Sequence, residues 1–338
     1  MPSDYLSALA QAHWPPDFGP PPATWHWLLQ ANGALAAHNN LLLFGFPDNR
    51  QEPALVAKIC RTPRYDHTLR REYVRLGELW QKWGADARGR APRPLTLAQH
   101  GADVVLLMSY CGGAPLLTAP TRFWQDAAQI QTLLQQAAIW LHDLHHHTAT
   151  PKSGAEMGAD FAASAAAFAD LFSLSEAEQE VLTALSEQVA RAETAASARA
   201  LLQGDFWPGN VIRSPAPGDA LDLILVDWQF SRWDSNVSLD VYLFLAVCAT
   251  KASPYDAAHA TRARLAAQTL LDWRTHLLPA YLAAYTPPPG CRLLPARAGL
   301  LACCVEMAAR PFLAFGLTQA DAVHWRTLFG ELHQHFMM

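Results

Sequence analysis

Residues 203–210 read Gln-Gly-Asp-Phe-Trp-Pro-Gly-Asn, and residues 223–228 read Leu-Ile-Leu-Val-Asp-Trp. In both places an apolar run leads to a carboxylate, and an asparagine follows the first carboxylate after a Pro-Gly turn. The resulting set is Asp205, Asn210 and Asp227. In phosphoryl transfer one carboxylate orients and deprotonates a hydroxyl, while an amide oxygen and a second carboxylate hold Mg²⁺ on the nucleotide phosphates. Because the phosphates and waters complete the coordination, one or two protein oxygens are enough.

Each of these residues alone also fits a β-hairpin with surface acids and a turn asparagine. All three in this order favour phosphoryl transfer. The pattern resembles the catalytic and metal-binding segments of the aminoglycoside phosphotransferase and choline kinase-like family, which shares the protein kinase fold. That family reads His-Gly-Asp, four residues, Asn, and then Ile-Asp-Trp or Ile-Asp-Phe at the end of the next strand. The departure is Gln203, which we expect to donate a hydrogen bond to the loop in place of the family's histidine.

Length and composition allow about two domains or lobes, since the chain has 338 residues. Hydrophobic residues make up 51% and charged residues 16%, which predicts a large buried core and little disorder. The formal net charge of −5 gives no basic surface for nucleic acid, so we expect no nucleic-acid partner.

The cysteines and the N-terminus favour a cytoplasmic protein. The six cysteines are scattered, without metal-binding spacing or a disulfide framework, which suits a reducing compartment. The N-terminus carries Asp4 and a proline-rich stretch at 15–22 where a signal peptide would have a basic and then an apolar segment. No uninterrupted apolar run reaches membrane-spanning length, so we expect no membrane partner. The oligomeric state stays open.

Three short strands are expected at 25–30, 40–46 and 55–60, separated by an Asn-Gly turn and a Pro-Asp-Asn turn. Short connections predict an antiparallel sheet. The first connection, residues 32–39, would be the nucleotide loop. It has one glycine and no Gly-x-Gly-x-x-Gly, so by itself it does not indicate phosphate binding.

Lys58 lies in the third strand, within Val-Ala-Lys-Ile, and resembles the kinase lysine that holds the α- and β-phosphates. A lysine among apolar residues is more often a surface residue with a buried stem. The helical segment 66–83 supplies a partner: Glu72 shares the face of two leucines at i−3 and i+4. Glu78 lies beside an arginine and a lysine and should be solvated. We therefore expect Glu72 to pair with Lys58.

Residues 104–110 are expected to form a strand that ends in Met-Ser-Tyr, followed by Cys-Gly-Gly-Ala-Pro-Leu. This resembles the family's hinge, in which an adenine would use backbone groups near Ser109, Tyr110 and Cys111. Without the flanking motifs, a plain strand and turn would explain the segment nearly as well.

The resemblance divides the chain into residues 1–109, a nucleotide-binding lobe, 110–116, the hinge, and 117–338, a helical lobe with the catalytic loop and the substrate pocket. A long helix is expected over 121–147, ending in Leu-x-x-Leu-His as in relatives. Its terminal histidines do not predict a metal site. Consecutive helical residues point in different directions, and the His142 and His146 pair has no third ligand.

Two alanine-rich helices are expected at 159–172 and 176–195, the second opened by a Ser175-x-x-Glu178 capping box. Asp240 resembles the family carboxylate that braces the catalytic loop from behind. It also fits an acid at a helix N-terminus, where the helix dipole favours it.

The region 241–338 should be mainly helical. In relatives the corresponding region lines the substrate pocket. Residues 241–338 hold eight lysines and arginines and five acids, a net +3 in a chain of net −5. A polycation would need carboxylates, so we expect a neutral or anionic hydroxylated acceptor in preference to an aminoglycoside. Aromatic residues could stack on a sugar or hold a quaternary ammonium, which leaves a choline-like acceptor open; they are Trp273, Tyr281, Tyr285 and Trp325.

The sequence thus predicts a bilobal α+β fold of the protein kinase type, with a small antiparallel-sheet lobe and a mostly helical lobe. The resemblance implies an ATP- and Mg²⁺-dependent phosphotransferase acting on a hydroxyl of a small molecule. Asp205 would be the base, Asn210 and Asp227 the metal ligands, and Lys58 with Glu72 the phosphate clamp. The alternative is a non-catalytic nucleotide-binding pseudokinase, prompted by Gln203 and the glycine-poor loop. Protein kinase activity is disfavoured because Asp-Phe-Gly and Ala-Pro-Glu are missing.

Overall fold

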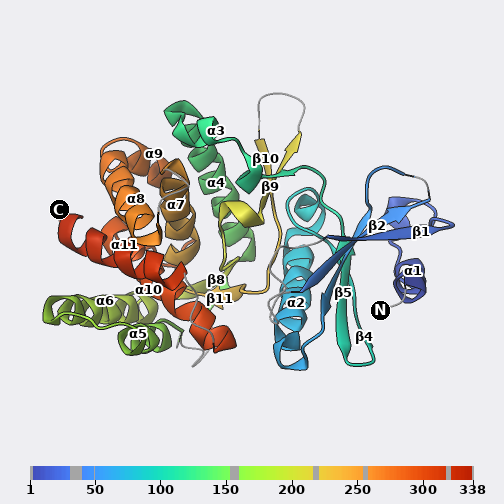
Figure 1. Cartoon of the computed structure of the whole chain (residues 1–338), viewed down its shortest axis with the longest axis horizontal. Coiled ribbons are helices and arrows are strands. Elements are labelled where there is room, and N and C mark those ends of the chain that lie inside the picture. The colour runs from blue at the N-terminus through green and yellow to red at the C-terminus, as the bar shows by residue number, and fades with distance from the viewer. Residues whose placement is uncertain are drawn as a thin grey trace. The chain divides into compact units, whose positions relative to one another are not determined.

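The structure is a computed structural model, drawn in Figure 1. It describes residues 3–30, 40–48, 50–152, 160–215, 221–253, 258–316 and 321–336. The expected nucleotide loop, 32–39, lies outside these residues.

By its contacts the chain divides into two compact units, which are described separately. The first unit comprises residues 1–115 and 210–231, and the second comprises 116–209 and 232–338. Residues 210–231 therefore pack with the N-terminal unit, whereas the lobes expected from the sequence put them in the C-terminal one. An antiparallel sheet in the first unit and helices throughout the second confirm the α+β class.

The first unit is built on a five-stranded antiparallel sheet. In spatial order its strands are β1 (Trp25–Gln30), β2 (Leu41–Pro47), β3 (Leu55–Cys60), β5 (Asp103–Ser109) and β4 (Pro94–His100). The four strands expected from the sequence are β1, β2, β3 and β5. The fifth, β4, was not among the expected strands; it begins at a proline, and its register with β5 shifts between Pro94 and Thr96.

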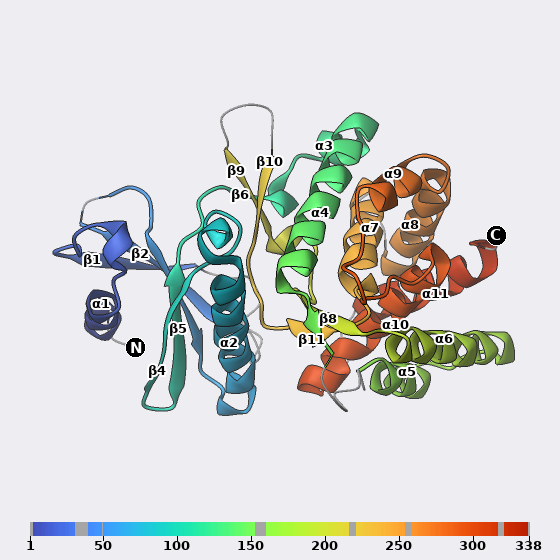
Figure 2. The ribbon, with the colours of Figure 1, turned by 180° about the vertical axis from the view of Figure 1, so that it is seen from behind.

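Helices cover both faces of this sheet. On one face α1 (Ser3–Ala12) places Leu6 and Ala10 in a core with Ala57, Ile59 and other apolar residues of β3 and β5. On the other face lies α2 (Asp66–Trp83), as Figures 1 and 2 show. Side chains alternate along a strand, so Lys58, between Ala57 and Ile59, faces α2.

Smaller elements complete the first unit. A three-stranded sheet holds β10 (Leu221–Leu225), β9 (Val211–Pro215) and β6 (Ala114–Pro115) in that order. Three short 3₁₀ turns are η1 (Pro16–Phe18), η2 (Pro63–Tyr65) and η3 (Gly84–Ala87).

The second unit surrounds a buried helix, α7 (Ser238–Ala252), in which every residue from Ser238 to Ala249 is buried. It packs against α4, α8 and α10. The other helices are α3 (Thr121–Gln125), α4 (Ala127–Thr148), α5 (Asp160–Leu171), α6 (Glu176–Thr194), α8 (His259–Trp273), α9 (Leu277–Ala283), α10 (Ala296–Phe315) and α11 (Asp321–His335). A three-stranded sheet has the order β11 (Arg232–Asp234), β8 (Ala198–Leu202), β7 (Thr150–Pro151), and short turns are η4 (Leu116–Thr118) and η5 (Pro208–Asn210).

Two helix starts show how local side chains set these bounds. The single helix expected over 121–147 is two helices, because the Asp126 carboxylate accepts the N–H groups of Ala128 and Gln129 and so opens α4. The expected capping box of α6 is confirmed: Glu178 N–H donates to Ser175 Oγ, and Ser175 N–H donates to Glu178 Oε2.

Among the residues that the structure describes, one helix, α10, is long and apolar enough to cross a membrane by length and composition. It carries Glu306 and Arg310, however, and 61% of its apolar window is buried against the rest of the protein. Its contacts are with α5, α7 and α11, as expected of a core helix.

Candidate active site

Lys58 occupies the middle of β3, where it pairs with Leu42 of β2 and Leu106 of β5. Its side chain is 9% exposed and points to α2. A buried ammonium requires partners, because burial without compensation disfavours the charged form.

Glu72 provides the first partner. Its position on α2 is fully buried between Leu69 and Leu76. Lys58 Nζ lies 2.7 Å from Glu72 Oε1 and 2.9 Å from Oε2. Glu78 instead accepts from Arg75 Nη1 at 2.8 Å and is partly exposed. The expected choice of Glu72 over Glu78 as the partner of Lys58 is confirmed.

Asp227 provides the second partner. Its Oδ1 lies 2.8 Å from Lys58 Nζ, and the next N–H group, that of Trp228, donates to Glu72 Oε1 at 3.1 Å. Asp227 has φ = +60°, a left-handed conformation that is uncommon for residues other than glycine and most tolerable for Asp and Asn. Burial alone would lower the pKa of Lys58, but the charges of Asp227 and Glu72 outweigh it and raise that pKa above its usual value. Lys58 is therefore a permanent cation.

Asn210 is tied to the same place through the backbone. Its carbonyl accepts the N–H of Val226, the residue before Asp227, at 2.9 Å. Lys58 faces the carboxyl groups of both Glu72 and Asp227. Burial raises the pKa of Glu72, whereas the Asp227 side chain is 33% exposed, so Asp227 is the carboxylate open to a metal ion. A carboxylate oxygen and an amide oxygen are ligands suited to Mg²⁺, so the donor set fits this ion.

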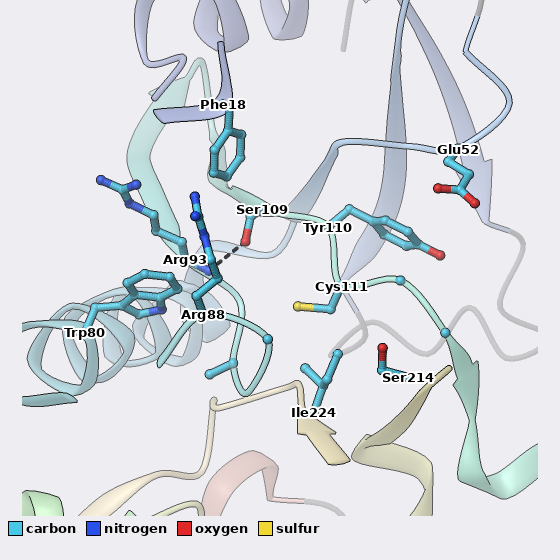
Figure 3. Close-up of a pocket in the computed structure, with 14 residues that line it drawn as sticks. Phe18, Glu52, Trp80, Arg88, Arg93, Ser109, Tyr110, Cys111, Ser214 and Ile224 are labelled. Carbon is cyan, nitrogen blue, oxygen red and sulfur yellow. Dashed lines mark hydrogen bonds between the residues drawn. The ribbon is translucent and has the colours of Figure 1, made fainter. Parts of the chain in front are cut away.

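The expected hinge residues line a cavity of about 450 Å³ within the first unit. Figure 3 shows Ser109, Tyr110 and Cys111 along it, with Ser214 and Ile224 of β9 and β10. The Ser109 N–H donates to the carbonyl of Arg93, and the Tyr110 N–H donates to the carbonyl of Ala54. Burial raises the pKa of the Cys111 thiol to about 12, so this wall presents a neutral thiol.

In the second unit, Asp240 holds the start of the loop 203–210, which was expected to be catalytic. This fully buried carboxylate accepts the N–H of Gln203 at 2.7 Å on Oδ2 and the N–H of Gly204 at 2.8 Å on Oδ1. Asp240 is also the third residue of α7, so both expected readings of this acid hold. Behind it, buried His145 lies 3.4 Å from Asp240 and 2.7 Å from the Tyr285 hydroxyl.

Gln203 is part of the same loop and is fully buried. Its side-chain Oε1 accepts the backbone N–H of Asp205 at 2.8 Å. The glutamine thus supports the loop as expected, although as an acceptor of this hydrogen bond, whereas we expected a donor.

Arg310 reaches Asp205 from α10. Its Nη1 lies 3.1 Å from Asp205 Oδ1, and the two side chains are 13% and 16% exposed. One turn earlier on α10, Glu306 accepts from Arg232 at 2.8 Å, and Arg232 also contacts Asp234 at 3.2 Å. No local motif identifies Arg310, because 105 residues separate it from Asp205.

The aromatic residues expected to stack on an acceptor mostly fill the core. Tyr281, Tyr285 and Trp325 are buried, and the Tyr281 hydroxyl donates to the carbonyl of Val241 at 2.8 Å. Among the described residues there is no group of three or more His, Cys, Asp or Glu side chains arranged to hold a metal ion by themselves. Instead, both His142 and His146 form a hydrogen bond with the carbonyl of Thr286, from Nδ1 at 3.1 Å and from Nε2 at 3.0 Å, respectively. These contacts give the two histidines at the end of α4 a structural role.

The chain shares a family model and its fold with known proteins. The model of the phosphotransferase enzyme family matches residues 39–285. No curated protein matches the chain.

Solved structures share its kinase-like fold. A putative aminoglycoside phosphotransferase from Ralstonia eutropha has a TM-score of 0.59 at 13% identity, covering 99% of this chain and 98% of that one. An amicoumacin kinase in complex with AMP-PNP, Ca²⁺ and its ligand has a TM-score of 0.56 at 12% identity, covering 98% and 93%. The GDP complex of aminoglycoside 2′-phosphotransferase-IIIa has a TM-score of 0.55 at 12% identity, covering both chains fully. They confirm the bilobal fold.

Proposed function

Because the chain belongs to the phosphotransferase enzyme family and is a small-molecule kinase, we propose that it transfers the γ-phosphate of ATP to a hydroxyl group of a small, uncharged or anionic acceptor. The observation that carries the proposal is the ion pair of Lys58 with Glu72 and Asp227, with Nζ–O distances of 2.7 and 2.8 Å. In a phosphotransferase such a lysine holds the nucleotide phosphates, while its glutamate partner keeps it in place.

Each residue has a distinct role in this proposal. Lys58, held by Glu72, binds the α- and β-phosphates, and Asp205 orients the acceptor hydroxyl and takes its proton. Asn210 and Asp227 would hold Mg²⁺, which when bound neutralises phosphate charge. The hydrogen bond from the Val226 N–H to the Asn210 carbonyl supports this assignment, because Val226 directly precedes Asp227. It holds the backbones of the two candidate ligands, Asn210 and Asp227, close together.

The base of the nucleotide would bind at the hinge cavity. The N–H groups of Ser109 and Tyr110 already donate within the sheet. We therefore assign the hydrogen bond to the base to the Cys111 N–H. A cytoplasmic location belongs to the same proposal, because all six cysteines are free.

The test is release of ADP from Mg·ATP in the presence of a panel of sugars, polyols, hydroxy acids, amino alcohols and antibiotics. The purified protein and its Asp205→Asn variant are compared on every compound. We expect turnover with at least one hydroxylated compound and a loss of about 10²–10⁴ in rate in the variant, which keeps its nucleotide affinity. A variant with near-normal turnover would remove Asp205 from the mechanism, and ATP binding without turnover on any compound would favour a pseudokinase.

A further inference from the structure

The contact between Arg310 and Asp205 places a positive charge directly on the proposed base. The catalytic loop itself, residues 203–210, contains no lysine or arginine. The cation beside the loop carboxylate therefore comes from α10, far along the chain, and only the packing of the second unit brings it there.

The neighbouring acid on the same face of α10, Glu306, has a partner of its own. Glu306, on the same face of α10 one turn earlier, is held by Arg232, and Arg232 also holds Asp234. These acids are 9% and 7% exposed in their side chains, whereas Arg310 and Asp205 are 13% and 16% exposed. The side chains of Arg310 and Asp205 thus keep somewhat more of their surface exposed than the two acids beside them.

We propose that Arg310 is a catalytic residue that binds the phosphoryl group during its transfer. This inference rests on the proposed function. In the transfer step the acceptor oxygen bonds to the γ-phosphorus, the bond from that phosphorus to the bridging oxygen of ADP breaks, and the hydroxyl proton passes to Asp205. The acceptor oxygen, which gives its proton to Asp205, is then bonded to the phosphorus. The phosphoryl oxygens therefore lie close to the Arg310 guanidinium that contacts Asp205.

Two properties of arginine suit it to this position. Its planar guanidinium has five N–H donors, so an arginine that contacts one carboxylate oxygen can bind a second anion at the same time. In addition, the negative charge of a loose phosphoryl-transfer transition state is spread over the equatorial oxygens, where a fixed cation stabilises it.

The ion pair also makes Asp205 a weaker base, and the proposed chemistry tolerates this. In a loose transition state the bond to the leaving group is largely broken before the acceptor oxygen loses its proton, so positioning matters more than base strength. Arg310 would therefore hold Asp205 in place before the reaction and stabilise the phosphoryl group during it.

The experiment uses the complete protein with Mg·ADP and aluminium fluoride, which mimics the transferred phosphoryl group without any acceptor. Binding of this complex and binding of Mg·AMP-PNP are measured for the unchanged protein, Arg310→Ala and Arg310→Lys. Arg264→Ala is the control, since Arg264 pairs with Glu331 at an exposed site. Slow release of ADP with water as acceptor is followed in parallel.

We expect Arg310→Ala to weaken binding of the fluoride complex and to slow ADP release by about 10²–10³-fold. This loss lies at or below the lower end of the range of about 10³–10⁵-fold that an arginine contributes to phosphoryl transfer in other enzymes. Mg·AMP-PNP affinity should stay nearly unchanged, and added methylguanidine should restore part of the lost rate. Arg310→Lys keeps the positive charge and replaces the alanine variant in the test if that variant does not fold. Its losses in fluoride-complex binding and in the rate of ADP release should be smaller than those of Arg310→Ala.

Unchanged binding of the fluoride complex in a folded Arg310 variant would overturn the inference while leaving the proposed function intact. Equal losses for the fluoride complex and AMP-PNP, without rescue, would also overturn it, because they indicate a structural role. If the unchanged protein neither binds the fluoride complex nor releases ADP, the proposed function fails, and the inference fails with it.

Discussion

The side-chain Oε1 of Gln203 accepts the backbone N–H of Asp205 at 2.8 Å. The turn that presents the proposed base is therefore fixed by a side chain two residues earlier, at the position where the family has a histidine. Gln203 is fully buried, so the packing around it fixes the position of this acceptor.

Gln203→Leu should lower turnover and stability together. The change removes the acceptor of the Asp205 N–H from a part-buried hydrogen bond, which costs about 0.5–1.5 kcal/mol. Gln203→His, by contrast, should keep equal or higher turnover with an unchanged melting temperature, since a ring nitrogen can accept the same bond. ADP release and thermal unfolding of both variants check this. A stability collapse of the histidine variant would show that the loop is built around glutamine.

Asp227→Ala should weaken binding of Mg·ATP and abolish turnover. The substitution removes a carboxylate that both contacts Lys58 and is assigned to the metal. Calorimetry of ATP binding with and without Mg²⁺ measures the effect, with Glu78→Ala of the same unit as the control. If Mg²⁺ improves ATP affinity as much in Asp227→Ala as in the unchanged protein, the metal assignment is wrong.

Glu193→Gln should stabilise the protein at alkaline pH and not at acidic pH. Burial, and then the charge of Asp234, raise the pKa of Glu193 to about 7 from an ordinary value of 4.5. Below 4.5 the group is protonated in both the folded and the unfolded state and has no effect. Between 4.5 and 7 the folded state keeps a proton that the unfolded state has lost, so stability falls as pH rises through this window.

The measurement for Glu193 is the melting temperature at pH 4.5 and at pH 8. The glutamine variant should exceed the unchanged protein at pH 8, by a margin that shrinks at pH 4.5. Glu180→Gln, an exposed acid on the same helix, is the control. An equal shift at both pH values would show that folding does not raise the pKa of Glu193.

A polycationic acceptor should be a poor substrate. Arg310 lies on Asp205, where the reacting hydroxyl must bind, so an ammonium next to that hydroxyl would face a guanidinium. We expect kcat/KM for kanamycin to be far below that for neutral polyols or hydroxy acids, as ADP release with matched concentrations would show. Efficient phosphorylation of kanamycin would contradict this expectation and redirect the search to cationic acceptors.

Much of the first unit is determined by the sequence itself. β1, β3 and α2 have the bounds that their patterns predict, because alternation and helical periodicity mark which side chains must be buried. The pairing of Lys58 with Glu72 follows from the same two periodicities, which turn each residue toward the other element. The spacing of Asp205, Asn210 and Asp227 likewise indicated a phosphotransferase without any structure.

Only the tertiary structure decided which distant groups meet. Arg310 reaches Asp205 and Tyr285 reaches His145 through the packing of α10, α4 and the segment after α9, and no local pattern records such contacts. Packing also turned expected acceptor-binding aromatics such as Tyr281 into core residues. Composition sets how many charges and rings a segment contains, but burial of one helix against another sets which of them reach the site, and that depends on the whole fold.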